Sequence, residues 1–306
     1  MKPSAHFATL LGLTSILQWS AQVLLSTYVL IFPPFQIIAM TFFIAFGLMA
    51  AKWLWRGENG WRYARLPPVV WIFALLGLFG YSFLLYLALD YAPAVEVSLL
   101  VNLWPLLMVL FCGLLPGEHL RWYHVLGCCI GFAGSLVLVG PAVMGLFDTG
   151  HLTGQLLALA SGAIWAAFCV SCRAAGDVPT DSVGWFCLAT ALLGLLCHFA
   201  GESSVLSAPP SAWWAIVILG LGPIGLAFFA WDVGLKHGHI RLLGVMAFFI
   251  PMLSAVLLIL AGEGDWTWQI VFATLLITGG ACVAAQDELL TLVRGRALVA
   301  VEDEPS

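Results

Sequence analysis

The chain has 306 residues, of which 62% are hydrophobic and 9% are charged, and its mean hydropathy is +1.03. So few polar residues cannot coat a water-soluble globule, which excludes the ordinary soluble enzymes and binding domains. The formal net charge of −5 comes partly from an acidic C-terminal tail and carries no information on nucleic-acid binding.

Ten apolar segments follow one another along the chain, each long enough to cross a bilayer as a helix. A helix rises about 1.5 Å per residue, so a span needs roughly 20 residues. The first segment is expected to remain in the protein, because its apolar stretch is too long for a signal peptide and lacks a clear cleavage site. The predicted spans cover residues 7–28, 34–54, 68–89, 94–115, 122–140, 152–172, 182–200, 211–233, 240–261 and 267–286.

Polar uncharged side chains form stripes on the first and fourth spans. Gln18, Trp19 and Gln22 share one helical face of the first span, and Ser98 and Asn102 do so on the fourth. An amide that faced hydrocarbon would be costly, so these side chains should point inward. They are expected to meet either a wet cavity or neighbouring helices, and the cavity is favoured.

Aromatic residues near span centres add to this set. Most of the 14 tryptophans lie near span ends, where an interfacial belt explains them. Trp19, Trp104 and Trp165 instead lie near span centres, where an indole N–H needs a partner. They either line a cavity for an aromatic or apolar solute or fill a core, and the sequence does not decide between these.

Proline and glycine predict irregular helices at three places. Pro105 and Pro251 each lie mid-span, where proline removes a backbone donor and bends the helix. Curvature is the expected role, and binding of a ligand ammonium by the freed carbonyls is the alternative. Gly222 and Pro223 belong to a glycine-rich run without a preceding strand, so a hinge is expected there and not a dinucleotide site.

The basic residues predict how the chain crosses the membrane. With ten spans, all 11 Lys and Arg residues fall on the side that holds the N-terminus. The protein is expected in the bacterial inner membrane. Because Lys and Arg are enriched in cytoplasmic segments, both of its termini are expected in the cytoplasm. These residues are Lys2, Lys52, Arg56, Arg62, Arg65, Arg121, Arg173, Lys236, Arg241, Arg294 and Arg296.

Ionisable residues are absent from the centre of every predicted span. Asp90 and Glu96 lie at the ends of the third and fourth spans, where helix capping or proton coupling could explain them. Transport down a gradient without proton coupling is therefore favoured. The histidines are dispersed and no phosphate-binding loop exists, so neither a metal nor any other cofactor is expected.

The sequence repeats itself with an offset of 146 residues. The most informative pairs are Trp19 with Trp165 and Pro105 with Pro251, because leucine matches are common in an apolar chain. Each repeat contains five spans, and an odd number makes the second repeat cross in the opposite sense. Inverted repeats of this kind are typical of secondary transporters, which bind substrate near the bilayer midplane.

Short motifs in both halves resemble the EamA repeat of the drug/metabolite transporter superfamily. The resemblance implies a basket of ten helices in which spans 1–4 and 6–9 surround a cavity and spans 5 and 10 stand behind it. Within the superfamily, the exporters of aromatic amino acids are the most similar group. The motifs are residues 88–96, 102–105 and 117–118 in the first half, and 234–238, 249–251 and 262–263 in the second.

The sequence therefore predicts an all-α membrane protein with ten transmembrane helices. The first five-helix repeat is placed at residues 1–145, the second at 146–289, and a disordered cytoplasmic tail at 290–306. The protein is expected to work as a monomer among membrane lipids.

The predicted function is export of aromatic and other hydrophobic amino acids by alternating access, without enzymatic activity. The alternatives are transport of another small metabolite or a lipophilic amine, with or without proton coupling, and an intramembrane lipid-modifying enzyme. The enzyme is disfavoured because no cluster of His, Asp or Glu lies at one depth. The predicted cavity residues are Gln18, Trp19, Gln22, Tyr81, Tyr86, Ser98, Asn102, Trp104, Trp165 and Phe248.

Overall fold

A computed structural model describes residues 3–117, 120–140, 149–263, 265–284 and 286. The first half contains α1 (Ala5–Thr27), α2 (Pro34–Trp55), a short η1 (Gly60–Ala64), α3 (Pro68–Leu75), the π-helical η2 (Leu76–Gly80), α4 (Tyr81–Leu89), α5 (Ala94–Val101), α6 (Trp104–Cys112) and α7 (Trp122–Val139). The second contains η4 (Thr149–His151), α8 (Leu152–Ala174), α9 (Ser182–Gly201), α10 (Pro210–Leu221), the π-helical η5 (Gly222–Leu226), α11 (Ala227–His237), α12 (Ile240–Met246), α13 (Phe249–Leu260) and α14 (Trp268–Ala284). The predicted tail and the predicted boundary between the repeats lie outside the described residues.

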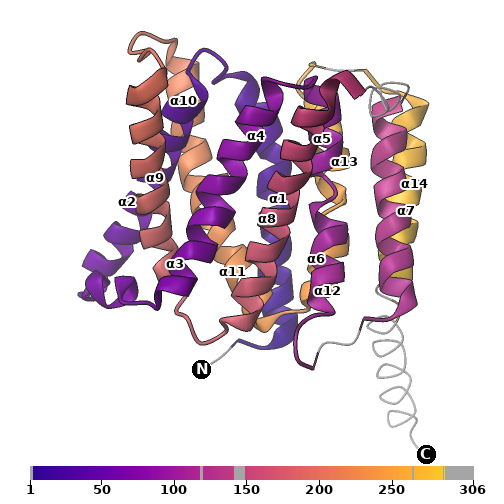
Figure 1. Ribbon diagram of the computed structural model, residues 1–306, viewed down its shortest axis with the longest axis horizontal. Coiled ribbons are helices and arrows are strands. Elements are labelled where there is room, and N and C mark those ends of the chain that lie inside the picture. Colours follow the sequence, from indigo (N-terminus) through magenta and orange to yellow (C-terminus); the bar gives the residue numbers. More distant parts are fainter. Residues whose placement is uncertain (1–2, 118–119, 141–148, 264, 285, 287–306) are drawn as a thin grey trace, which may run out of the picture.

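The described helices match the predicted spans closely. Nine spans are long and apolar enough to cross a membrane, and α14 is a shorter apolar helix of 17 residues. The helices stand side by side, with their axes roughly parallel (Figure 1). Large apolar side chains such as Leu10, Leu196 and Leu275 are exposed on the outside of the bundle, which suits a hydrocarbon solvent. The chain is thus a multi-pass membrane protein.

Local sequence explains where several helices begin. Ser4 caps α1 by accepting a hydrogen bond on its hydroxyl from the backbone N–H of Phe7 at 3.3 Å. Proline occupies the first helical position of α2, α3 and α10, where its missing N–H costs nothing.

The two repeats have the same irregularities at equivalent places. The π-helical segments η2 and η5 are separated by the 146-residue offset, and each interrupts the third span of its repeat. The fourth spans are likewise broken in both repeats, between α5 and α6 and between α12 and α13. These shared irregularities show that the two repeats have similar backbone conformations as well as similar sequences.

The second repeat runs in the opposite sense to the first. Near the start of α1, the hydroxyl of Thr9 accepts a hydrogen bond from the N–H of His239 at 2.9 Å. At the end of α8, the guanidinium of Arg173 donates to the carbonyl oxygen of Gly238 at 3.3 Å. The start of α1 and the end of α8 therefore lie at one face, so equivalent helices are antiparallel.

One face of the bundle is rich in basic residues. We call the face where α1 begins the basic face, and it lies at the bottom of Figure 1. The other face, where α1 ends, is called the opposite face. Among the described residues, the helix ends and connections at the basic face contain Lys52, Arg56, Arg62, Arg65, Arg121, Arg173, Lys236 and Arg241.

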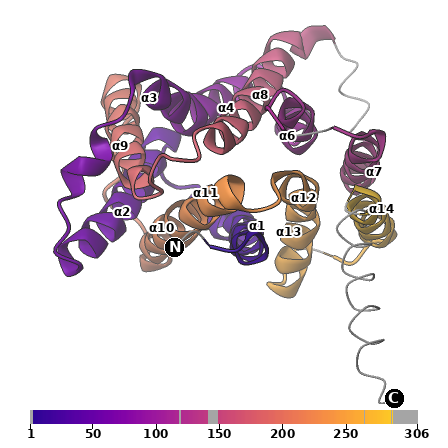
Figure 2. The same ribbon diagram turned by 90° about the horizontal axis from the view of Figure 1, so that it is seen from below.

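Helices α7 and α14 pair with each other at one end of the molecule, beside α6, α12 and α13 (Figure 2). Their backbones nearly touch: a Cβ added to Gly127 would lie 2.5 Å from the carbonyl oxygen of Gly280, and the reverse distance is also 2.5 Å. Small residues permit this approach where lipid offers no hydrophobic driving force for helix association.

Candidate functional site

A central cavity of about 260 Å³ lies inside the bundle. It straddles the two repeats, because residues 146 positions apart occur on its wall, such as Trp19 with Trp165 and Leu78 with Ile224. Aromatic rings and uncharged polar groups form most of its surface. The lining residues are Trp19, Gln22, Val23, Ser26, Phe42, Leu78, Tyr81, Ser82, Asn102, Trp104, Trp165, Ile224, Phe228 and Ile250.

A cluster of aromatic rings, which we call the aromatic floor, lies between the cavity and the basic face. Trp19, Trp104, Trp165 and Phe228 line the cavity, and Trp231 packs behind them against Trp19 and Trp104. The rings of Trp19 and Trp165 meet edge to face with centroids 5.9 Å apart, and those of Trp19 and Trp231 lie 5.0 Å apart. Phe228 lies 5.9 Å from Trp19 and 5.8 Å from Trp165. Edge-to-face pairs of this kind stabilise a fixed arrangement of rings.

Two indoles of the floor are anchored by hydrogen bonds to protein atoms. Trp19 donates its indole N–H to the carbonyl oxygen of Pro223 at 3.0 Å, within the π-helical segment η5. Trp231 donates to the sulfur of Cys169 at 3.3 Å. In the described part of the chain, the indole N–H of Trp165 has no protein acceptor, so it can donate to a solute in the cavity.

Polar side chains line the part of the cavity above the floor. The amide of Asn102 donates to the hydroxyl of Ser98 over a long 3.4 Å, and its carbonyl oxygen remains available. Gln22 has no side-chain hydrogen bond within the described residues, although an unsatisfied amide at this depth is costly. Both amides are therefore suited to bind the ends of a polar solute.

A second cavity adjoins the central cavity on the side of the opposite face. It measures about 370 Å³ and lies between the end of α1, the start of α2 and α10. We call it the vestibule. It shares Gln22, Ser26 and Ile224 with the central cavity, so the two spaces adjoin each other. The vestibule also contains Tyr86 on its wall.

Towards the basic face the path is blocked. Below the aromatic floor lies a void of about 10 Å³, with Phe168, Phe228 and Trp231 on its wall. A further cavity of about 240 Å³ lies beyond it, at the basic face. The central cavity therefore adjoins a larger space on the side of the opposite face, and aromatic side chains separate it from the basic face.

The structure brings most of the predicted cavity residues together. Ser98 does not line the cavity itself, but its hydroxyl accepts the hydrogen bond from the lining residue Asn102. The predicted residues that line the central cavity or the vestibule are Trp19, Gln22, Tyr81, Tyr86, Asn102, Trp104 and Trp165.

Two predicted cavity residues lie elsewhere. Phe248 is 1% exposed and packs behind the cavity, where a Cβ added to Gly131 of α7 would lie 2.9 Å from its ring. The break between α12 and α13 turns this side chain towards the α7–α14 pair. Gln18 donates to the carbonyl oxygen of Thr14 in its own helix at 3.3 Å and lies beside Gly222. It is part of neither the central cavity nor the vestibule.

The predicted bends correspond to irregular backbone. The chain leaves the helix at Asn102 and Leu103, just before Pro105, and at Ala247 and Phe248, just before Pro251. Pro105 frees the carbonyl oxygen of Val101, four residues earlier. This oxygen faces α8, where a Cβ on Gly162 would lie 2.8 Å from it. This packing favours the interpretation that the proline bends shape the basket.

The two carboxylates considered for proton coupling differ in their surroundings. Asp90 is exposed at the end of α4. Glu96 is 3% exposed, and its carboxylate lies 3.0 Å from Nδ1 of His151 and accepts a bond from Nε2 of Gln155 at 2.9 Å. Neither lines the central cavity, so a proton at either site has no direct contact with a solute there.

Several lining residues were not predicted, including Phe42, Leu78, Ile224, Phe228 and Ile250. They are apolar residues in apolar helices, so no polar stripe marks them. The repeat offset is a signal that could have found some of them, since it carries Trp104 to Ile250 and Ser82 to Phe228. Among the described residues, no three His, Cys, Asp or Glu side chains could hold a metal ion.

Comparison with known proteins places this geometry in context. The sequence model of the EamA-like transporter family matches the chain twice, over residues 6–140 and 152–286. The aromatic amino acid exporter YddG of Ancylobacter novellus is 45% identical over 92% of this chain and 98% of its own length. The aromatic amino acid exporter YddG of Escherichia coli K12 is 26% identical, over 72% of this chain and 78% of its own. A solved crystal structure with 44% identity covers 92% of this chain and 98% of that chain, with a TM-score of 0.87.

Proposed function

The chain belongs to the EamA-like transporter family, and from this premise we propose that it exports aromatic and other hydrophobic amino acids across the bacterial inner membrane. It moves its substrate unchanged and has no catalytic activity. Exporters of aromatic amino acids are among its relatives, and one of them is 45% identical to it over nearly its whole length.

The observation that carries the proposal is the composition of the central cavity. Indole and phenyl rings on its floor suit an aromatic side chain, which gains from edge-to-face and stacked contacts. The amides of Gln22 and Asn102, with the N–H of Trp165, suit the ammonium and carboxylate of an amino acid. Among the described residues, no Asp, Glu, Lys or Arg lines this cavity, and a zwitterion needs no net counter-charge there.

The basic face is assigned to the cytoplasm, because Lys and Arg are enriched in cytoplasmic segments. The central cavity then adjoins the vestibule on the outer side and is separated from the cytoplasm by aromatic side chains, as in the state that has just released its substrate. The inverse state follows from exchanging the conformations of the two repeats, whose equivalent helices run in opposite senses. The protein acts as a monomer in this scheme.

Uptake by proteoliposomes of the purified protein tests the substrate class. Labelled phenylalanine and tryptophan are expected to enter at saturable rates well above those of empty liposomes, and threonine more slowly. Phenylalanine and tryptophan rates equal to those of empty liposomes would show that the substrate class is wrong.

Gln22→Leu is expected to raise the KM for phenylalanine about tenfold, because the leucine keeps the volume but cannot bind the amino-acid backbone. Gln18→Leu is the matched control, one helical turn away and outside the cavity, and its KM is expected to change less than about twofold. Equal effects of the two substitutions would contradict the placement of Gln22 in the site.

Transport is expected to be facilitative, since no carboxylate of the described residues lines the central cavity. In proteoliposomes, phenylalanine flux should be indifferent to an imposed pH gradient of about one unit. Glu96→Gln keeps the shape of the side chain and should change the flux less than about twofold. A flux that appears only with the gradient and is abolished by Glu96→Gln would show that transport is proton-coupled through this carboxylate.

A further inference from the structure

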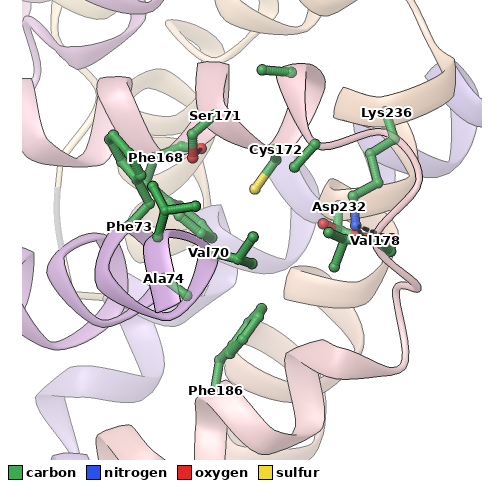
Figure 3. Close-up of a pocket in the computed structure, with 13 residues that line it drawn as sticks. Val70, Phe73, Ala74, Phe168, Ser171, Cys172, Val178, Phe186, Asp232 and Lys236 are labelled. Atoms are coloured by element: carbon green, nitrogen blue, oxygen red, sulfur yellow. Dashed lines mark hydrogen bonds and ion pairs between the residues drawn. The ribbon is translucent and has the colours of Figure 1, made fainter. Parts of the chain in front are cut away.

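The cavity at the basic face contains a buried ion pair. It measures about 240 Å³ and is enclosed by α3, α8, the start of α9 and α11 (Figure 3). Phe73 and Phe168 lie on one side of it, and Asp232 and Lys236 lie on the other. The side chains of this ion pair are only 7% and 4% exposed.

This cavity is the repeat equivalent of the vestibule at the opposite face. Residues 146 positions apart line the two spaces: Phe168 and Gln22, Cys172 and Ser26, Asp232 and Tyr86, and Phe73 and Leu219. In an inverted repeat, exchanging the conformations of the two halves exchanges these spaces. The basic-face cavity is therefore the vestibule of the inward-facing state.

The spaces also lie in series along one path. The small void below the aromatic floor shares Phe168, Cys172 and Asp232 with the basic-face cavity. It shares Leu78 and Phe228 with the central cavity. Movement of aromatic side chains at this void would join the basic-face cavity to the central cavity. A solute that enters from the basic face then passes Asp232 before it reaches the central cavity.

The two vestibules differ in charge although they are equivalent in position. The Nζ of Lys236 lies 2.6 Å from Oδ2 of Asp232 and donates to the carbonyl oxygen of Val178 at 2.9 Å. The hydroxyl of Thr180 donates to the same Oδ2 at 2.5 Å. At the opposite face, the equivalents of this ion pair are the neutral Tyr86 and the exposed Asp90.

Burying such a pair is expensive. Taking two charges out of water costs several kcal/mol per ion, which mutual attraction repays only in part. Ionisable residues inside membrane proteins are rare and mark substrate or ion pathways. An ammonium has three N–H donors, and the described residues use two of those on Lys236. One donor remains for a further acceptor in the cavity.

We propose that Asp232 and Lys236 form a loading site for the zwitterionic backbone of the substrate on the cytoplasmic side. This inference rests on the proposed function. In the inward-facing state Asp232 receives the α-ammonium and Lys236 receives the α-carboxylate, while the apolar side chain points towards Phe168. Substrate binding replaces one internal ion pair by two pairs with the ligand, so neither buried charge is left unpaired.

The loading site makes the two sides of the transporter unequal. A zwitterion meets paired charges on the cytoplasmic side, whereas the described residues that line the outer vestibule are uncharged. Recognition of both ends of the amino-acid backbone is therefore concentrated where an exporter collects its substrate. The rival interpretation is that the ion pair only holds the segment at Val178 and Thr180 closed, without touching substrate.

Membrane vesicles allow the two sides of the transporter to be tested separately. Everted vesicles present the cytoplasmic face to the medium, and right-side-out vesicles present the outer face. The readout is inhibition of labelled phenylalanine uptake by two competitors. Phenylalaninamide keeps the ammonium but lacks the carboxylate, and N-acetylphenylalanine keeps the carboxylate but lacks the ammonium. In wild-type everted vesicles, each competitor should need a concentration at least about tenfold higher than unlabelled phenylalanine to inhibit uptake equally.

In the Lys236→Gln variant, phenylalaninamide should inhibit as well as phenylalanine, while N-acetylphenylalanine stays weak. In the Asp232→Asn variant, N-acetylphenylalanine should inhibit as well as phenylalanine, while phenylalaninamide stays weak. Both effects should occur in everted vesicles and be absent in right-side-out vesicles, whose uptake also shows that the variants are folded. The double variant Asp232→Asn/Lys236→Gln leaves no unpaired buried charge, and both competitors should inhibit it as well as phenylalanine does.

The chain offers a matched control. Lys52 and Asp181 form another ion pair at the basic face, at 2.5 Å, and neither lines the cavity. Lys52→Gln and Asp181→Asn should leave both competitor ratios unchanged. If the Asp232 and Lys236 variants slow uptake but keep the wild-type ratios, the loading site is overturned and the proposed function stands. If wild-type vesicles take up no phenylalanine, the proposed function itself fails.

Discussion

Trp165→Ala is expected to reduce phenylalanine flux in proteoliposomes about tenfold or more, without loss of folded protein. Trp165 is the hub of the aromatic floor, with ring centroids 5.5 Å from both Tyr81 and Phe168 and 5.9 Å from Trp19. Its indole N–H also has no protein acceptor in the described part of the chain. Alanine removes both the aromatic face and the donor, and it opens the floor that separates the central cavity from the basic face.

Two further variants sharpen this test. Trp165→Phe keeps a ring but loses the N–H, and its flux should lie between those of wild type and the alanine variant. Trp214→Ala removes an indole that is 67% exposed on the outside of α10, and its flux should equal that of wild type. Normal transport by a well-folded Trp165→Ala variant would remove Trp165 from the site.

Gly280→Leu should destabilise the protein severely. A Cβ at this position would lie 2.5 Å from the carbonyl oxygen of Gly127 and 2.8 Å from the backbone N of Gly131. Backbone atoms cannot move aside as a flexible side chain can, so α7 and α14 must separate. Overpacking of this kind costs about 3 kcal/mol or more, which corresponds to a fall of about 10 °C in the midpoint of thermal unfolding.

The neighbouring glycine is the control for that substitution. Gly279 faces outward, and a Cβ added there would have no atom within 4 Å. Gly279→Leu should therefore unfold within about 2 °C of wild type when both are heated in the same detergent. Equal loss of stability in the two variants would mean that the leucine side chain itself is harmful and not the closeness of the two helices.

The repeat made much of the fold predictable from the sequence. A periodic apolar chain predicts helices of known length, and the 146-residue offset predicts their arrangement in two halves. Trp19 and Trp165 show how far this reaches: residues that match in the repeat turn out to touch across the boundary between the halves, with ring centroids 5.9 Å apart. The irregular backbone at Gly222 and Pro223 was predicted as a hinge, but the π-helical form of η2 and η5 was not, since five-residue hydrogen bonding depends on tertiary packing.

The predicted site was less complete, for a physical reason. Neighbouring positions such as Gln18 and Trp19 are separated by one helical step, so a small rotation of α1 decides which of them reaches the cavity. Phe248 and Asn102 are repeat equivalents, yet Asn102 faces the cavity and Phe248 packs behind it. A helix break changes the direction of the side chains that follow, and its geometry is set by packing that the sequence pattern does not contain.

Asp232 and Lys236 illustrate the same limit. Their spacing of four residues predicts an ion pair on one face of a helix. Which cavity this pair faces depends on how α11 packs against α8 and α3. The repeat relation to Tyr86 becomes informative only when both cavities are known.

Counterflow of phenylalanine tests the central claim, alternating access for an aromatic amino acid, most directly. Proteoliposomes loaded with unlabelled phenylalanine are placed in medium with a trace of labelled phenylalanine. A carrier whose cavity faces one side at a time exchanges one molecule for another, so the label should rise transiently above its equilibrium value. Entry of the label that only approaches equilibrium, with or without the internal load, would contradict alternating access.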